Sequence, residues 1–239
     1  MPTCFVRRIR RKNMKNEAHP LPPGLNVSYE DDIDYGSLRK TEPRIARYIH
    51  AALGDAKFIL NIGAGSGSYE PEDRTLVAVD PSAKMMANRN AGGCVQLVRA
   101  RADHLPFKED SFDATMGVLT LHHWHNKEQS LYEVIRVTKG NIVFFTFDPT
   151  IKTFWLSDYF PELATVDDHH MPTIQELEGY LGPIDVQTIP VPHNCIDGFL
   201  YAYWRRPHAY LDTRVRSVMS SFHMIANVDH GLRRLASDL

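Results

Sequence analysis

The sequence predicts an α/β fold, with a mostly parallel sheet, helices on both of its faces and a small lid. Short apolar segments typical of strands alternate with segments of helical periodicity. The strand segments are continuously apolar, as in Ile142-Val143-Phe144-Phe145, and strands that are buried on both faces require this. A glycine-rich turn at residues 63–67 follows the first strand segment, which indicates a ligand site where that strand ends.

The elements follow one another in this order. The first helix is expected to begin near Thr41-Glu42-Pro43, with Thr41 as its N-cap. The segment between Gly67 and Thr75 contains Pro71 and is too short for a three-turn helix, so the first crossover is expected to be a clipped helix or a loop. Strands are predicted at 58–62, 75–79, 94–98, 112–117 and 141–147, and further helices at about 82–89 and 126–137.

Beyond Asp148-Pro149 the pattern changes to an aromatic, proline-containing stretch that continues through residue 172. After it, the periodicity predicts a helix near 173–181, a strand at 184–190 and a long helix from about 207 to 227. At 239 residues, 43% of them hydrophobic, the chain can bury one substantial core, so a single domain with a lid is expected.

The charge is distributed unevenly. Residues 7–12 carry five positive charges, and removing these from the net charge of −2 leaves −7 for the remainder. An acidic body is a poor counterion for nucleic acid, so no nucleic-acid partner is expected. No segment approaches the length of a membrane span, so no membrane association is expected either. The oligomeric state has no signature in the sequence.

Residues 1–20 are expected to form a basic, disordered tail; the alternative is that the protein truly begins at Met14. They lack the apolar core of a signal peptide and the serine content of a transit peptide. The three cysteines, Cys4, Cys94 and Cys195, are odd in number and far apart, which favours a reducing cytoplasm over a disulfide framework.

The glycine turn and the next strand form the pattern of a nucleoside-binding site. Glycines allow a ligand to approach the backbone closely, and Asp80 at the tip of the second strand can accept both hydroxyls of a ribose. A dinucleotide site needs its third glycine one residue later, where this chain has Ser68. The ligand is therefore expected to be a nucleoside without a pyrophosphate.

The spacing G-x-G-x-G at 63–67 resembles motif I of the class I S-adenosylmethionine (SAM)-dependent methyltransferases. Three more segments resemble this family in order: residues 79–86, the segment 104–113 with its LPF and SFD triplets, and residues 117–124. The second of these is similar to the type 11, ubiquinone/menaquinone-methyltransferase-like branch. The resemblance implies a Rossmann-like class I methyltransferase fold with a seven-stranded sheet, and SAM as the cofactor.

The resemblance also implies how the chain is organised. It divides the chain into the tail at 1–20, a cofactor-covering segment and helix at 21–54, a SAM-binding core at 55–149, and the lid and C-terminal part at 150–239. The cofactor-binding residues that it implies are Arg39, Asn61, Gly63, Ala64, Gly65, Asp80, Pro81, Ala102, Asp103, Gly117 and Val118.

Two positions depart from the family pattern. Asn61 stands where relatives usually have an acid, and an amide accepts a hydrogen bond without the charge. Arg101 replaces an acid that accepts from the adenine amine, and a guanidinium has no acceptor. The adenine contact is therefore expected from Asp103 or from the backbone.

The acceptor is expected beyond the carboxyl ends of the strands at 112–117 and 141–147. The residues predicted to bind it are His122, Trp124, Asp148, Trp155 and Tyr159. His123 is the candidate base, because an imidazole titrates near neutral pH; the alternative is a structural histidine. Trp155 and Tyr159 have an alternative role as packing between the lid and the sheet. The histidines lack the spacing of a metal site, so no metal is expected.

The sequence thus predicts an enzyme, a SAM-dependent methyltransferase that acts on a small molecule which the sequence does not identify. One alternative is a SAM-binding protein without catalysis, in a regulatory or scaffolding role, which the changes at Asn61 and Arg101 make conceivable. A second alternative, an NAD(P)-dependent oxidoreductase, is disfavoured by Ser68 and by the LPF and SFD triplets.

Overall fold

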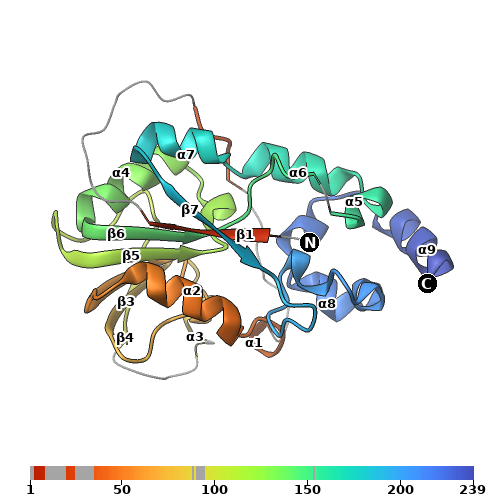
Figure 1. Cartoon of the computed structure of the whole chain (residues 1–239), viewed down its shortest axis with the longest axis horizontal. Helices are drawn as coiled ribbons and strands as arrows, with labels where there is room; N and C mark the ends of the chain where they lie inside the picture. Colours follow the sequence, from red (N-terminus) through yellow and green to blue (C-terminus); the bar gives the residue numbers. More distant parts are fainter. Residues whose placement is uncertain (1–2, 9–19, 25–34, 88, 90–94, 153) are drawn as a thin grey trace.

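The computed structural model describes residues 3–8, 20–24, 35–87, 89, 95–152 and 154–239. Its centre is a five-stranded parallel sheet in the order β4-β3-β2-β5-β6 (Figure 1). The strands are β2 (Phe58–Ile62), β3 (Thr75–Asp80), β4 (Val95–Arg99), β5 (Phe112–Val118) and β6 (Thr138–Phe145). All five confirm predicted strands, with ends that differ by up to three residues.

The remaining two described strands do not extend this sheet. β1 (Thr3–Arg8) pairs antiparallel with β7 (Asp185–Pro190), from Thr3 opposite Pro190 to Arg8 opposite Asp185. The strands of the described chain are thus divided into five and two, and the seven-stranded sheet is not confirmed. β1 lies within the expected tail, so at residues 3–8 the structure shows a paired strand in place of disorder. Residues 9–19 lie outside the described part.

Alternating side chains of the parallel strands contact two separate apolar clusters, one on each face of the sheet. In β6, Val143 and Phe145 belong to one cluster, whereas Ile142 and Phe144 belong to the other. α2 (Pro43–Leu53) covers the first face, while α4 (Lys127–Val137) and α7 (Ile174–Leu181) cover the second. This two-faced burial explains why the strands are continuously apolar. These three helices confirm predicted ones.

The first crossover is a loop with no helix between Gly67 and Thr75, and α3 (Ala83–Ala87) forms a short second crossover. The predicted cap of α2 was wrong by one residue. Glu42 occupies the N-cap position, where its side chain accepts from the backbone N–H of Arg44. Thr41 instead accepts from the backbone N–H of Tyr69 at 2.8 Å, so its hydroxyl holds the crossover loop.

The predicted long helix at 207–227 was wrong. This region contains a 3-10 helix (Pro207–Leu211), α8 (Thr213–Ser217) and a second 3-10 helix (Ser220–His223). Asp212 interrupts the helical course, since its carboxylate accepts from the backbone N–H of Arg214 at 2.9 Å and caps α8. A further helix, α9 (Val228–Asp238), was not predicted.

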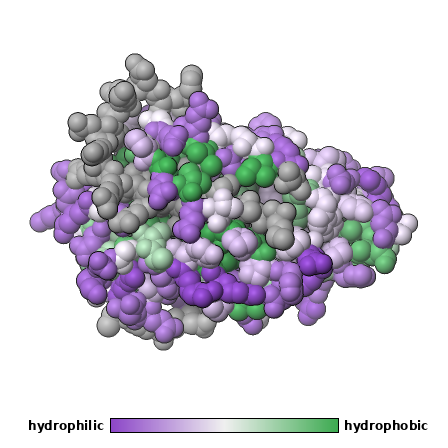
Figure 2. All heavy atoms as spheres, in the orientation of Figure 1, coloured by the Kyte–Doolittle hydropathy of each residue, from purple (hydrophilic) through white to green (hydrophobic). Residues whose placement is uncertain are grey.

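The C-terminal part packs at one end of the sheet as a group of short helices (Figure 1). It includes α5 (Leu156–Tyr159), α6 (Glu162–His170), a 3-10 helix at Leu200–Tyr203, and α8 and α9. The short helix α1 (Tyr35–Leu38) lies beside the loop that follows β7. Figure 2 shows that the visible face is mainly hydrophilic, with apolar side chains in separate patches. No helix in the described residues is both long and apolar enough to cross a bilayer.

Candidate functional site

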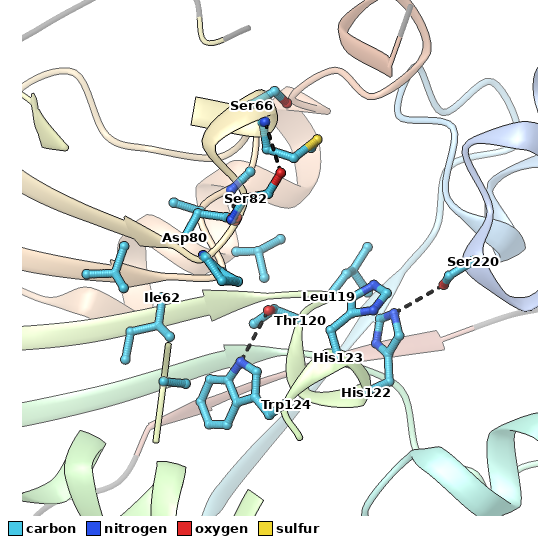
Figure 3. A pocket seen from close by; sticks show the side chains of 18 of the residues that line it. Ile62, Ser66, Asp80, Ser82, Leu119, Thr120, His122, His123, Trp124 and Ser220 are labelled. Atoms are coloured by element: carbon cyan, nitrogen blue, oxygen red, sulfur yellow. Dashed lines mark hydrogen bonds between the residues drawn. The ribbon is translucent and has the colours of Figure 1, made fainter. Parts of the chain in front are cut away.

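A cavity of about 660 Å³ lies at the carboxyl ends of β2, β3 and β5. Its wall combines the glycine turn, the start of α3, the 3-10 helix Leu121–His123 and two C-terminal segments. Figure 3 shows Asp80 and Ser82 on one side, and His122, His123 and Ser220 on the other. Small-molecule sites commonly have volumes of about 300–1,000 Å³, so the cavity can hold a nucleoside and a second ligand.

The glycine turn depends on the absence of a side chain at Gly63. Its φ is +66°, and a Cβ there would lie 1.9 Å from Oγ1 of Thr120. The N–H of Gly63 donates to the carbonyl of Val79 at 2.8 Å, which ties the turn to the end of β3. Trp124 Nε1 donates to the same Thr120 hydroxyl at 3.3 Å. The turn and the loop after β5 therefore fit against each other with no spare volume.

Asp80, at the end of β3, is only 8% exposed. Its two carboxylate oxygens each accept a backbone N–H at 2.8 Å, one from Gly65 and one from Ser82. Burial raises the pKa of Asp80, while these two donors and the Arg89 charge act in the opposite direction. A carboxylate has about four acceptor positions, so two remain for further hydrogen bonds. Asp80 can therefore accept both hydroxyls of a ribose.

Asn61 is supported by an acid that the sequence reasoning did not identify. Its Nδ2 donates to Oε1 of Glu70 at 2.7 Å, and the other oxygen of Glu70 is ion-paired with Arg89. Arg89 also donates to the carbonyl of Gly65 at 3.2 Å. Because the amide N–H₂ faces Glu70, Oδ1 of Asn61 remains as an acceptor. Glu70 lies in the unusual crossover loop, and its position beside Asn61 has no signature in the sequence.

Arg101 and Asp103 form a pair at the adenine end expected from the family resemblance. Nε and Nη2 of Arg101 donate to the two carboxylate oxygens of Asp103 at 2.9 and 2.7 Å. The Arg101 side chain is 55% exposed, and its hydrogen bonds lower the pKa of Asp103. The guanidinium of Arg101, which departs from the family pattern, is thus bound by the carboxylate of the neighbouring Asp103. Both residues line the cavity together with Ala102.

Two adjacent histidines form the side of the cavity opposite Asp80. The rings of His122 and His123 lie 4.0 Å apart between centroids, and Nε2 of His122 is 3.4 Å from the Ser220 hydroxyl. Burial, with the charges of Arg39 and Lys127, lowers the pKa of His123 to about 4. Burial and the neighbouring His123 lower the pKa of His122 well below its usual value. Both imidazoles are therefore neutral at pH 7.

Most of the predicted cofactor residues lie in the cavity wall, and Gly117 is the exception. A Cβ at Gly117 would lie 3.0 Å from the ring of Phe144, so this glycine makes room inside the sheet. The predicted residues in the wall are Arg39, Asn61, Gly63, Ala64, Gly65, Asp80, Pro81, Ala102, Asp103 and Val118. His122, His123 and Trp124 also lie in the wall.

Three residues predicted to bind the acceptor lie outside the wall. Asp148 accepts from the backbone and hydroxyl of Thr150 in an exposed turn. Trp155 donates to the Trp204 carbonyl at 2.9 Å, and Tyr159 donates to Asp238 at 2.9 Å. Both aromatic side chains therefore contact the C-terminal helical part of the chain, and their role toward the acceptor stays a prediction.

The wall at this end is completed by residues that the sequence reasoning missed: Phe147, Phe199, Leu200, Val218, Met219, Ser220 and Ser221. Phe147 ends the predicted strand at 141–147, beyond which the acceptor was expected. The other six come from the region predicted as one long helix and from the loop before it, and nothing in the sequence pattern directed them toward the cavity. Among the described residues, no group of three or more His, Cys, Asp or Glu side chains is arranged to hold a metal ion.

A family model described as a methyltransferase domain matches residues 60–146. Among solved structures, a candidate methyltransferase from an antibiotic biosynthesis pathway of Anabaena variabilis is 32% identical. The match covers 84% of this chain and 87% of that one, with a TM-score of 0.75. It therefore extends well beyond the matched domain, into the helical C-terminal part.

Curated relatives share shorter regions. A chloroplastic 2-methyl-6-phytyl-1,4-hydroquinone methyltransferase 1 from Oryza sativa is 25% identical over 68% of this chain and 54% of its own length. A demethylmenaquinone methyltransferase from Thermobifida fusca is 32% identical over 38% of this chain and 44% of its own length. The matched regions span between a third and about half of the first curated relatives.

Proposed function

Because the chain belongs to the class I SAM-dependent methyltransferases, in the type 11 branch, we propose that it transfers the methyl group of SAM to a small-molecule acceptor. The observation that carries this proposal is the cavity, whose wall joins the glycine turn, Asp80 and the histidine pair. SAM supplies an electrophilic methyl group bound to a sulfonium. The chain must hold the acceptor beside that group and exclude water.

The residues present fit this cofactor. Asp80 has acceptor positions left for the ribose hydroxyls, and Oδ1 of Asn61 can accept from the ammonium of the methionine end. Arg39 lies in the same wall and supplies a cation for the carboxylate. We assign the adenine end to Pro81, Ala102 and Asp103.

The acceptor is proposed to be a neutral molecule with an apolar body. The part of the wall beyond the histidines is mostly apolar, with Phe147, Phe199, Leu200 and Met219, and Ser220 adds a hydroxyl. Ionised side chains are absent from this group of described residues, so it has no partner for a charged acceptor. Since two relatives are named for hydroquinone and demethylmenaquinone methylation, phenolic and quinol acceptors form the first class to assay.

We propose His123 as the residue that receives the acceptor's proton. Burial lowers its pKa to about 4, below the near-neutral value expected from the sequence, so the imidazole is neutral at pH 7 and is a weaker base than an exposed imidazole. The Ser220 hydroxyl would bind the acceptor, and His122 would orient this hydroxyl, since its Nε2 lies 3.4 Å from the Ser220 oxygen. We also propose a cytoplasmic location, which rests on the three widely spaced cysteines.

Titration calorimetry with SAM, S-adenosylhomocysteine and NADH tests the cofactor. Transfer of a labelled methyl group from SAM to a panel of phenols and hydroquinones, and to a cell extract, tests the activity. Binding of both SAM compounds with transfer to an acceptor is the expected result. Binding without transfer to anything in the panel or extract would favour the non-catalytic alternative, and binding of NADH alone would favour the oxidoreductase.

A further inference from the structure

A fully buried carboxylate, Asp197, connects the cavity to the C-terminal part of the chain. Its Oδ1 accepts from Nε of Arg39 at 2.7 Å, and its Oδ2 accepts from the hydroxyl of Tyr69 at 2.8 Å. Asp197 is 0% exposed, so its charge needs both partners to offset the loss of water. The three residues come from three distant segments, since 158 positions separate Asp197 from Arg39 and 128 separate it from Tyr69.

Arg39 is the only one of these three residues in the cavity wall, if the described residues alone are considered. Its Nε is occupied by Asp197, and its Nη1 donates to the Tyr35 hydroxyl at 2.9 Å. A guanidinium has five N–H donors in a fixed plane, so these two bonds fix the direction of the whole group. Within the described chain Nη2 has no hydrogen-bond partner, and this nitrogen remains to bind an anion.

The backbone around Asp197 is fixed to the segment that carries Arg39. The N–H of Gly198 donates to the Leu38 carbonyl at 2.8 Å, and a Cβ at Gly198 would lie 2.8 Å from that oxygen. The N–H of Ile196 donates to Glu42 at 3.1 Å. The loop after β7 thus lies along the segment between α1 and α2 (Figure 1). The hydrogen bonds of Ile196 and Gly198, on either side of Asp197, therefore fix the position of its backbone relative to Arg39.

We propose that Asp197 is a positioning residue for cofactor recognition: by binding Nε, it orients the Arg39 guanidinium so that Nη2 binds the carboxylate of the methionine end. This inference rests on the proposed function. Its consequence is a selective one, since loss of Asp197 should weaken binding of ligands that carry the carboxylate and leave adenosine recognition by Asp80 intact.

Two ligands separate this role from a general effect on folding. S-adenosylhomocysteine carries the carboxylate, whereas decarboxylated S-adenosylhomocysteine keeps the adenosine, thioether and ammonium. The unmodified protein is expected to bind the first at least tenfold more tightly. In Asp197→Asn this preference should fall to about threefold or less, with affinity for the decarboxylated ligand changed by less than threefold. Asp55→Asn is the control, since Asp55 is exposed and makes no hydrogen bond or ion pair with the described residues.

Equal weakening of both ligands in Asp197→Asn would overturn the inference, because Asp197 would then be structural. An unmodified protein that binds both ligands equally would also overturn it, while leaving the cofactor assignment intact. Binding of neither ligand would contradict the proposed function itself. If Asp197→Asn does not fold, Tyr69→Phe decides: it removes one bond to Asp197 and should reduce the preference twofold to fivefold, and an unchanged preference would overturn the inference.

Discussion

At the scale of single residues, the hydrogen bonds already present decide what each side chain of the cavity can still bind. Two acceptor positions of the Asp80 carboxylate are occupied by backbone N–H groups, and two remain open. The amide N–H₂ of Asn61 donates to Glu70, so its oxygen remains as an acceptor for a ligand. An acid of the crossover loop, Glu70, therefore lies beside Asn61 and is ion-paired with Arg89.

Substitution of Asp80 by Ala should weaken binding of S-adenosylhomocysteine by about 1–3 kcal/mol, because hydrogen bonds to a charged group fall in this range. Titration calorimetry measures the loss, and Asp55→Ala serves as the exposed control. An affinity that does not change in Asp80→Ala would show that the ribose lies elsewhere in the cavity.

Substitution of His123 by Ala should reduce turnover at least tenfold and change cofactor affinity little, because the imidazole is proposed to act on the acceptor. With a pKa of about 4, His123 is neutral above this pH and protonated below it. Turnover limited by this group should therefore be constant from about pH 5 to 8 and fall as the pH drops through 4.

Steady-state kinetics across this pH range provide the measurement, and His230→Ala is the control because His230 is exposed on α9 and lies outside the cavity wall. Full turnover in His123→Ala would make His123 a structural residue and would point to a nucleophile that needs no base.

At the scale of elements, the parallel strands were predictable because each one is apolar on both faces, and two clusters bury alternate side chains. The C-terminal helices were not. Their helical periodicity continues from 207 to 227, but Asp212 caps a new helix in the middle of it. The prediction therefore missed residues that complete the cavity, such as Ser220. In a continuous helix their side chains would point in directions that differ from those in the structure.

Substitution of Gly63 by Ala should lower the free energy of unfolding by about 1–3 kcal/mol, because a Cβ would overlap Thr120 and the backbone has a positive φ. Gly36→Ala is a matched control, since a Cβ at Gly36 meets no atom within 4 Å. Denaturant unfolding of both variants measures the difference. Equal stability of the two would mean that the turn after β2 adjusts at no cost.

At the scale of the whole molecule, the N-terminal strand β1 pairs with β7, the last strand of the described residues. β1 and β7 pair over six residues each, and β1 also lies against β6, the edge strand of the parallel sheet. The basic composition of residues 1–20 predicts a disordered tail, but residues 3–8 form a strand that pairs with β7. Pairing between strands so distant in sequence depends on the fold, and local composition does not contain it.

A chain that begins at Met14 lacks β1 and should melt at a lower temperature than a chain of residues 1–239, because β7 loses its paired neighbour. For a chain of this size each kcal/mol lost lowers Tm by about 2–4 °C. Calorimetry measures the change, and a chain that begins at Thr3 is the control. Identical melting of the Met14 chain would show that β1 contributes nothing to stability.

The contact between Arg39 and Asp197 also sets an order of events during synthesis. The segment 35–44 and the glycine turn leave the ribosome early, but the carboxylate that orients Arg39 is made 158 residues later. Ser220 and Met219, which complete the opposite wall, follow later still. A nascent chain can therefore form its parallel sheet and the Asp80 end of the cavity before Asp197, on which recognition of the carboxylate is proposed to depend, has been synthesised.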